Sequence, residues 1–120
     1  MQITEAKLSD EEVLTVFITG MEGGIGYWSI AESYRWMHLY DENDKAKPLD
    51  PDQVLVVLSD TEGDDFKMEE LTPKKIQAGF MYVLNTYPHL INYDHGDLDV
   101  DANGADAIIQ AGLFGTVVYG

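Results

Sequence analysis

The sequence predicts an α+β fold with a single globular domain at residues 1–120 and a small, mainly antiparallel sheet with about three helices packed on one face. Capping residues precede segments whose apolar side chains recur every three or four positions, which is typical of amphipathic helices. Short β-branched runs bounded by turn residues lie between them, which is typical of strands. A chain of 120 residues with 45% hydrophobic residues has the length and composition of one domain with one core.

The N-terminal part is expected to contain an edge strand at residues 2–7 and a helix at residues 10–21. Ser9 can cap this helix, and Glu12 stands three residues later, as in a capping box. An apolar stripe follows at helical spacing, and the glycines that begin at Gly20 end it.

The segment 30–38 carries bulky residues at even positions, which predicts a strand with one aromatic face. A helix over residues 29–39 is the alternative for this segment. Residues 41–53 contain five acids, two lysines and two prolines, and are expected to form a solvated loop.

The second half begins with an expected hairpin, made of a β-branched strand at 54–58, a turn at 61–64 and a return strand at 66–71. A helix should start at Pro73, with Thr72 as its N-cap, and end before Pro88.

The C-terminal part is expected to form a helix at 102–114. Its apolar residues share one face, and Gly115 ends it. The β-branched run at 116–119 then predicts a terminal strand.

The composition excludes several classes of function. The chain has 22 acidic and 7 basic side chains and a net charge of −15, so it lacks the clustered cations that bind nucleic acid or anionic membranes. It has no cysteine, which excludes disulfides and thiolate metal sites. It shows neither an apolar run of about 18 residues nor a signal peptide, so a soluble intracellular protein without membrane contact is expected.

The candidate ligand site begins in a glycine-rich segment that precedes two aromatic residues. Three glycines could let the backbone approach a ligand, and the two rings offer stacking faces. The segment follows a helix and lacks the Lys-Ser/Thr of a phosphate-binding loop, so a helix C-cap and tight turn are the alternative. The residues concerned are Gly23, Gly24, Gly26, Tyr27 and Trp28.

Two polar residues of the C-terminal helix complete this candidate site. Asp106 and Gln110 are four residues apart, so they share one helix face beside the apolar stripe and could orient a ligand. The alternative is an ordinary solvated helix edge.

A weak calcium candidate lies at the start of the same helix. Asp99, Asp101 and Asn103 match the first oxygen positions of an EF loop, with Gly104 at the sixth position. The twelfth position holds Gln110 in place of the expected glutamate. The alternative is that Asp101 caps the helix.

Other catalytic patterns are missing. His38, His89 and His95 do not have the spacing of a metal-binding motif, although His95 lies among carboxylates. No serine stands in a nucleophile motif. We therefore expect no resident metal, no cofactor and no enzymatic activity.

The two ends of the chain together resemble a family of small proteins of unknown function encoded by tailed bacteriophages and prophages. Residues 21–28, Met-Glu-Gly-Gly-Ile-Gly-Tyr-Trp, are similar to its E-G-G-x-x-Y-W motif. Residues 101–120 are similar to an ending in which an A-D-x-x-x-Q helix runs into L-F-G-x-V-V-Y-G. The resemblance implies a setting, the cytoplasm of a host bacterium, and no activity.

Three functions follow from these observations. The first is a non-enzymatic accessory protein that binds a host protein or a small ligand, for example in counter-defence, with a homo-oligomer also compatible with the sequence. The second is mimicry of nucleic acid, in which carboxylates imitate phosphates and inhibit a DNA-binding host protein. The third is a metal-dependent hydrolase that uses Asp and His.

Overall fold

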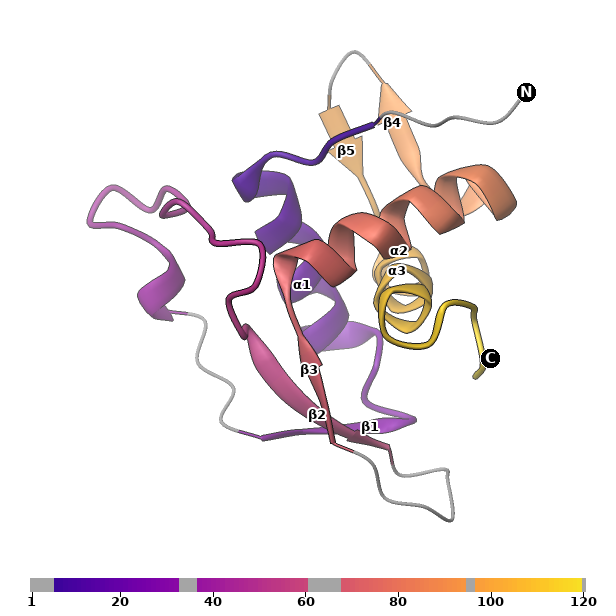
Figure 1. Cartoon of the computed structure of the whole chain (residues 1–120). Coiled ribbons are helices and arrows are strands. Elements are labelled where there is room, and N and C mark those ends of the chain that lie inside the picture. The colour runs from indigo at the N-terminus through magenta and orange to yellow at the C-terminus, as the bar shows by residue number, and fades with distance from the viewer. Residues whose placement is uncertain (1–5, 33–36, 61–67, 95–96, 120) are drawn as a thin grey trace.

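The computed structural model describes residues 6–32, 37–60, 68–94 and 97–119 (Figure 1). Within these residues it contains three α-helices and two antiparallel sheets, which confirms the predicted α+β class. The helices are α1 (Asp10–Gly23), α2 (Pro73–Thr86) and α3 (Ala102–Phe114). The larger sheet has the order β1-β2-β3, with β1 at Ser29–Glu32, β2 at Val56–Asp60 and β3 at Met68–Leu71. The smaller sheet is a hairpin of β4 (Asn92–Asp94) and β5 (Asp97–Asp99).

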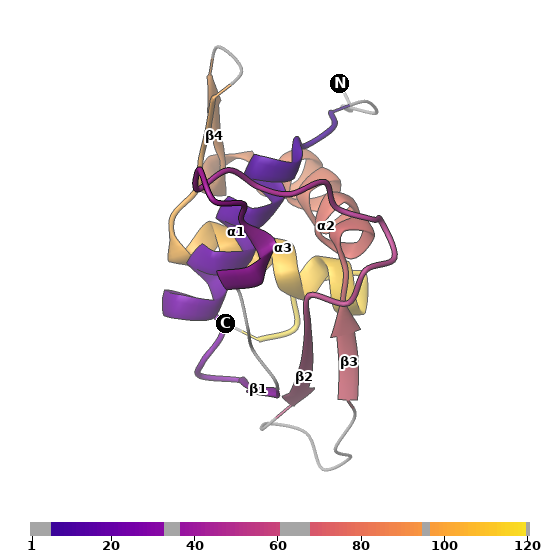
Figure 2. The same cartoon turned by 90° about the vertical axis from the view of Figure 1, so that its left-hand side faces the viewer.

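The three helices form one layer and the β1-β2-β3 sheet forms another. Figure 2 shows the three helices above the β1-β2-β3 sheet, with strand β4 on the far side of the helices. Helix α3 lies between α1 and α2 and also contacts β3. Its residues 104–111 are all buried, so α3 is the central element of the core. Among the described residues, no helix has both the length and the apolar character needed to cross a membrane.

Each helix begins at a side-chain cap. The Ser9 hydroxyl accepts a hydrogen bond from the Glu12 N–H at 3.2 Å, and the Glu12 carboxylate accepts one from the Ser9 N–H at 2.9 Å, which completes the predicted capping box. Thr72 caps α2, as predicted, and Asp101 caps α3. These caps satisfy backbone donors that have no partner inside the helix.

Glycines allow the helices to approach closely. A Cβ atom on Gly79 of α2 would overlap the Ile108 carbonyl of α3, and one on Gly112 of α3 would overlap the Lys75 carbonyl of α2. On the other side of α3, a Cβ on Gly20 of α1 would meet the Ile109 side chain. The small residues therefore set the separation between α3 and both neighbouring helices.

The structure corrects the expected strand at 30–38. Only Ser29–Glu32 is a strand, and Met37–Leu39 is a short 3-10 helix, while residues 33–36 lie outside the described residues. Helix α1 is two residues longer than the predicted 10–21. The predicted strand at 2–7 lies mostly outside the described residues, and residues 6 and 7 are not in a strand.

The hairpin expected at 54–71 is present with a shifted first strand. Strand β2 covers Val56–Asp60, two residues later than predicted. Val56 pairs with Leu71 and Leu58 pairs with Glu69, and both β2 residues are buried in the core. The predicted turn at 61–64 and the first part of the return strand lie outside the described residues. The short 3-10 helix at Pro88–Leu90 and the β4–β5 hairpin that follows it are not predicted.

The terminal segment 116–119 is not a strand, which corrects the prediction from its β-branched composition. The backbone reverses at Gly115, which has the left-handed φ of 79° that closes α3. Segment 116–119 then lies against α3, where a glutamine side chain takes the hydrogen-bonding role of a neighbouring strand.

We expect Gly79→Ala to destabilise the protein by about 1–3 kcal/mol, because the added methyl group would force α2 away from α3. Helix propensity alone would favour alanine by about 1 kcal/mol. Gly23→Ala is the matched control, since its Cβ would make an ordinary 3.5 Å contact with Ala102. Chemical denaturation of both variants measures the difference. Equal stability of the two variants would contradict the close approach of α2 and α3.

Candidate functional site

The structure brings together four of the residues that the sequence singled out. Tyr27 and Trp28 come from the turn that follows α1, and Asp106 and Gln110 come from successive turns of α3. Their side chains form one hydrogen-bonded network, which we call the Asp106 cluster. The predicted convergence of these residues is therefore present.

The turn after α1 aims the aromatic residues at α3. Gly24 is the C-cap of α1, and its N–H donates to the Gly20 carbonyl at 2.9 Å. The N–H groups of Trp28 and Ser29 then donate to the Ile25 carbonyl, which forms a tight turn. A Cβ on Gly24 would lie 2.7 Å from the Ala102 carbonyl, so glycine allows this turn to lie against the start of α3.

Asp106 is a buried carboxylate with three donors. Its Oδ2 accepts from the Tyr27 hydroxyl at 2.6 Å, and its Oδ1 accepts from the Trp28 indole at 2.7 Å and from the Gln110 amide at 2.8 Å. The residue is only 8% exposed, so these bonds replace the water that an exposed carboxylate would bind. The negative charge is thus stabilised by three neutral donors, two from the turn after α1 and one from α3 itself.

Gln110 is fully buried and binds the main chain of the C-terminal segment. Its Oε1 accepts from the N–H groups of Val118 and Tyr119 at 2.8 and 2.7 Å. Its Nε2 has two hydrogens and three acceptors in range. The two nearest acceptors are Asp106 Oδ1 at 2.8 Å and the Tyr119 carbonyl at 3.1 Å. The carboxamide thus contacts the peptide backbone at three points.

An aromatic group completes the cluster. The Trp28 ring stacks on the Tyr119 ring with centroids 5.3 Å apart and an interplanar angle of 14°. Phe114 packs edge-on against both rings, at 5.6 Å from Trp28 and 6.0 Å from Tyr119. Stacked and edge-on pairs of this kind add about 0.5–1.5 kcal/mol each beyond the burial of their surface.

The cluster is therefore occupied by the chain itself. The prediction of a solvated helix edge for Asp106 and Gln110 is wrong, since both side chains are buried. The stacking face of Trp28 holds Tyr119 in the position expected for a ligand. The arrangement binds the backbone of residues 118–119 by three hydrogen bonds and holds one aromatic ring against Trp28.

The glycines at 23, 24 and 26 serve mainly as a helix end and a turn, which is the alternative that the sequence left open for this segment. Gly23 is the last residue of α1 and Gly24 is its C-cap, while a Cβ on Gly26 would meet nothing within 4 Å. Among the described glycines, only Gly115 has a positive φ. The glycine segment therefore provides close packing and a turn.

The cluster raises the pKa of the Tyr27 phenol from 10.0 to about 12. Burial of the hydroxyl is the largest cause, and its hydrogen bond to the negative Asp106 carboxylate adds to it. The Tyr27 ring is still 49% exposed, so the hydroxyl is held inside the cluster while the ring borders solvent.

The contacts of the weak calcium candidate match helix capping. The Asp101 carboxylate accepts a hydrogen bond from the Gly104 N–H at 2.9 Å. A Cβ on Gly104 would overlap the Leu90 carbonyl and the Val100 side chain, so packing explains this glycine. Within the described parts of the chain, no three His, Cys, Asp or Glu side chains are grouped so that they could hold a metal ion. His95 lies outside the described residues.

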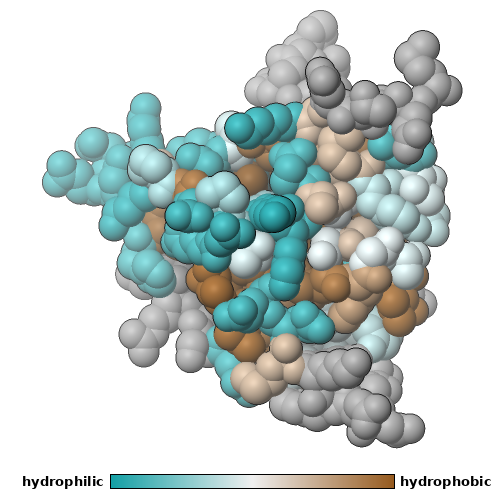
Figure 3. Space-filling view, in the orientation of Figure 1, coloured by the Kyte–Doolittle hydropathy of each residue, from teal (hydrophilic) through white to brown (hydrophobic). Residues whose placement is uncertain are grey.

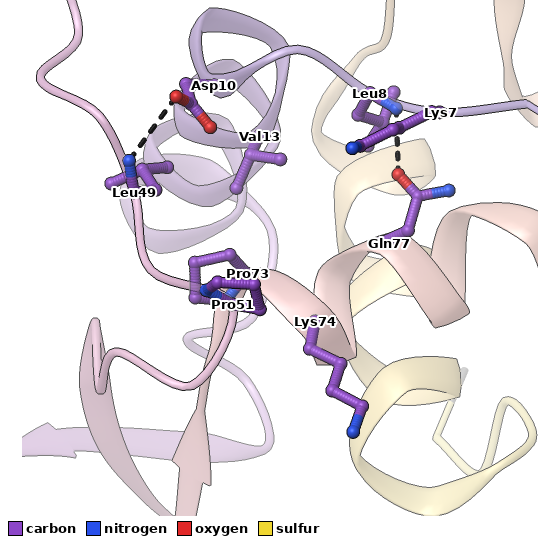
Figure 4. Close-up of a pocket in the computed structure, with 9 residues that line it drawn as sticks. All are labelled: Lys7, Leu8, Asp10, Val13, Leu49, Pro51, Pro73, Lys74 and Gln77. Carbon is purple, nitrogen blue, oxygen red and sulfur yellow. Dashed lines mark hydrogen bonds between the residues drawn. The ribbon is translucent and has the colours of Figure 1, made fainter.

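A separate hollow of about 240 Å³ lies between the N-terminal segment, the start of α1 and the start of α2 (Figure 4). Two of its four polar side chains hold main-chain groups, since Gln77 accepts from the Leu8 N–H at 2.8 Å and Asp10 accepts from the Leu49 N–H at 3.3 Å. None of the predicted site residues lines this hollow.

Two residues with important contacts, Tyr119 and Gln77, are not among the predicted site residues. Gln77 holds the main chain of residues 6–8 in the way that Gln110 holds 118–119, because its amide also donates to the Ala6 carbonyl at 2.5 Å. A glutamine on the apolar face of a predicted helix is a usable signal for such a contact, since buried amides require partners.

We expect Gln110→Ala to destabilise the protein by about 1–3 kcal/mol, because Asp106 loses a donor and the segment 118–119 loses its acceptor. Carboxypeptidase digestion should then remove the C-terminal residues faster than in the wild type. The matched control is Gln53→Ala, whose side-chain oxygen accepts a long 3.4 Å hydrogen bond from the Asp50 N–H in the exposed loop. This change should alter stability by less than about 0.5 kcal/mol. Equal digestion rates of Gln110→Ala and the wild type would contradict the role of Gln110.

We expect the stabilising effect of the Tyr27 hydroxyl to depend on pH. The folded pKa of about 12 is above the ordinary value of 10.0, so the folded state holds the proton more tightly than the unfolded state. The contribution should be complete below pH 10 and be lost as the pH rises towards 12. Denaturation of the wild type and Tyr27→Phe across this range measures it. A stability difference that stays constant between pH 10 and 12 would refute the linkage.

Comparisons with known protein families, with curated proteins and with solved structures find no match to this chain. The resemblance to phage-encoded proteins therefore stays a prediction from the sequence motifs, and the function is argued from the site.

Proposed function

We propose that this protein is a non-enzymatic accessory protein that acts by binding another protein, and that the Asp106 cluster is its recognition element. The observation that carries the proposal is the binding of the main chain of residues 118–119 by the Gln110 carboxamide. A side chain that contacts backbone N–H and C=O groups can accept an extended segment of another sequence. The Trp28 ring then selects segments that place an aromatic residue over it.

The cluster offers little to a chemical reaction. Three of the four lone-pair sites of the Asp106 carboxylate accept hydrogen bonds from the protein, and the residue is buried. The Tyr27 hydroxyl is committed as a donor with a raised pKa. A general base needs a free lone pair aimed at a substrate. These contacts favour binding over catalysis.

The positions of several acids favour protein binding over mimicry of nucleic acid. Glu11 accepts from the Ala46 N–H at 2.7 Å, and Asp41 accepts from the N–H groups of Asn43 and Lys45. The Asp41 bonds hold the pKa of that carboxyl below its usual value. Carboxylates used to order the loop at 41–53, which forms the mostly hydrophilic projection in Figure 3, are not free to imitate a row of phosphates.

The setting of the proposal is infection of a bacterium, since the chain resembles small proteins of tailed phages. The partner would then be a host protein in the bacterial cytoplasm. It would insert an extended segment with an aromatic side chain into the Asp106 cluster and displace residues 116–119.

The test uses the full chain and a synthetic peptide with the sequence Gly-Thr-Val-Val-Tyr of residues 115–119. A tethered segment has an effective concentration in the millimolar range, so the peptide should bind the wild type weakly. Tyr119→Ala removes the stacked ring and should strengthen peptide binding by at least about tenfold. In a Trp36→Phe background Trp28 is the only tryptophan, and its fluorescence reports the stacking.

The control is the double variant Tyr119→Ala with Gln110→Ala, which should lose this binding because the backbone contacts are gone. If Tyr119→Ala binds the peptide no better than the double variant, the cluster serves folding alone and the proposal fails.

Capture from bacterial lysate at low and high salt tests the alternative that the protein mimics nucleic acid. Mimicry predicts that DNA-binding proteins are captured and that they are released as salt screens the charge.

A further inference from the structure

We propose that the outer face of the β1-β2-β3 sheet is a second interaction surface, which binds a basic amphipathic segment of a partner protein. The surface consists of two rows of side chains on the face opposite the buried Val56, Leu58 and Leu71. Its residues differ from those of the Asp106 cluster, so it does not depend on the function proposed above.

The strand register defines the two rows. Ile30 pairs with Ser59, and Ser59 pairs with Met68, so these three residues form the first row. Adjacent strands place paired residues on the same face of the sheet.

The second row lies two residues further along each strand, on the same face. Glu32 pairs with Val57, and Val57 pairs with Glu70. An apolar side chain in the central strand is thus flanked by a carboxylate on each edge strand.

The apolar residues of this face are unusually exposed. Ile30 is 55% and Met68 is 54% exposed, although a solvated sheet face normally carries polar side chains. Val57 between the two glutamates is only partly buried. Ile30 and Met68 lie on either side of the buried Ser59, and exposed apolar side chains with a polar rim are typical of interaction sites.

A second observation on the same face points to a missing partner. The Ser59 hydroxyl lies between Ile30 and Met68, is 1% exposed and has no hydrogen-bond partner. Buried hydroxyls are almost always bonded. A polar group of a partner seated on this row would supply the bond that the Ser59 hydroxyl lacks.

Charge complementarity identifies the class of partner. Glu32 and Glu70 are exposed on the two edge strands, about 10 Å apart across two strand spacings. Lys or Arg residues at positions i and i+7 of a helix have nearly the same separation, about 10.5 Å, with apolar positions between them. A basic amphipathic helix therefore matches both the carboxylates and the apolar side chains.

The charge argues against other occupants. A second copy would bring two further glutamates against Glu32 and Glu70, and each copy carries a net charge of −15. Nucleic acid and anionic membranes would meet the same carboxylates. A cationic segment is the occupant that gains from them.

The test titrates the full-length protein with a fluorescently labelled helical peptide that carries Arg at i and i+7, Leu at i+3 and i+4, and uncharged residues elsewhere. We expect saturable binding that weakens at high salt. Ile30→Thr and Met68→Gln should each weaken it about tenfold, and Glu32→Gln with Glu70→Gln should remove most of the salt dependence.

Matched controls separate this surface from general attraction to an acidic protein. Val54→Gln changes an apolar residue that is 44% exposed and precedes β2, and Glu22→Gln removes an exposed charge from α1, so neither should alter binding. A peptide with the same composition and Arg at i and i+3 should bind more weakly. Circular dichroism checks that each variant is folded.

Two results would overturn the proposal. One is absence of saturable binding to the wild type, and the other is equal affinity of the wild type, the sheet-face variants and the controls, which indicates unspecific electrostatic attraction. Both results leave the Asp106 cluster untouched, because its test uses a different peptide and different variants.

Discussion

The buried carboxylate of Asp106 connects three separate parts of the chain. It joins the turn after α1, through Tyr27 and Trp28, to the central helix α3 and, through Gln110, to the C-terminal segment. A buried carboxylate without a cation costs several kcal/mol unless its lone pairs are bonded, so all three donors must be in place together. The correct position of one donor therefore favours the correct position of the others.

Two glutamines fix the ends of the described chain by the same physical means. Gln77 of α2 binds the backbone of residues 6–8, and Gln110 of α3 binds the backbone of residues 118–119. A carboxamide has one acceptor and one donor group, as a peptide unit does, so it can replace a neighbouring strand. Because α2 and α3 are held in close contact at Gly79 and Gly112, both terminal segments are fixed to one rigid pair of helices.

The sequence predicts the helices best because each has a local signal. Ser9, Thr72 and Asp101 are caps whose chemistry acts over three or four residues, and Gly115 closes α3 as expected. The acidic composition of the β4–β5 hairpin is typical of a loop, so its sequence carries no local signal for strands. Segment 116–119 was predicted as a strand because β-branched residues favour extended backbone, whether the partner is a strand or a side chain.

The residues that form the Asp106 cluster could be predicted from the sequence, while the binding of residues 118–119 in it could not. The spacing of Asp106 and Gln110 places them on one face of a helix, and the Tyr27-Trp28 pair follows a helix end that can meet them. Burial of that face depends on the path of residues 115–119 after Gly115, which is a tertiary property. Tyr119 stacks on Trp28 at the end of that path. The turn at Gly115 carries it onto the ring, so the site expected for a ligand is closed by the chain that forms it.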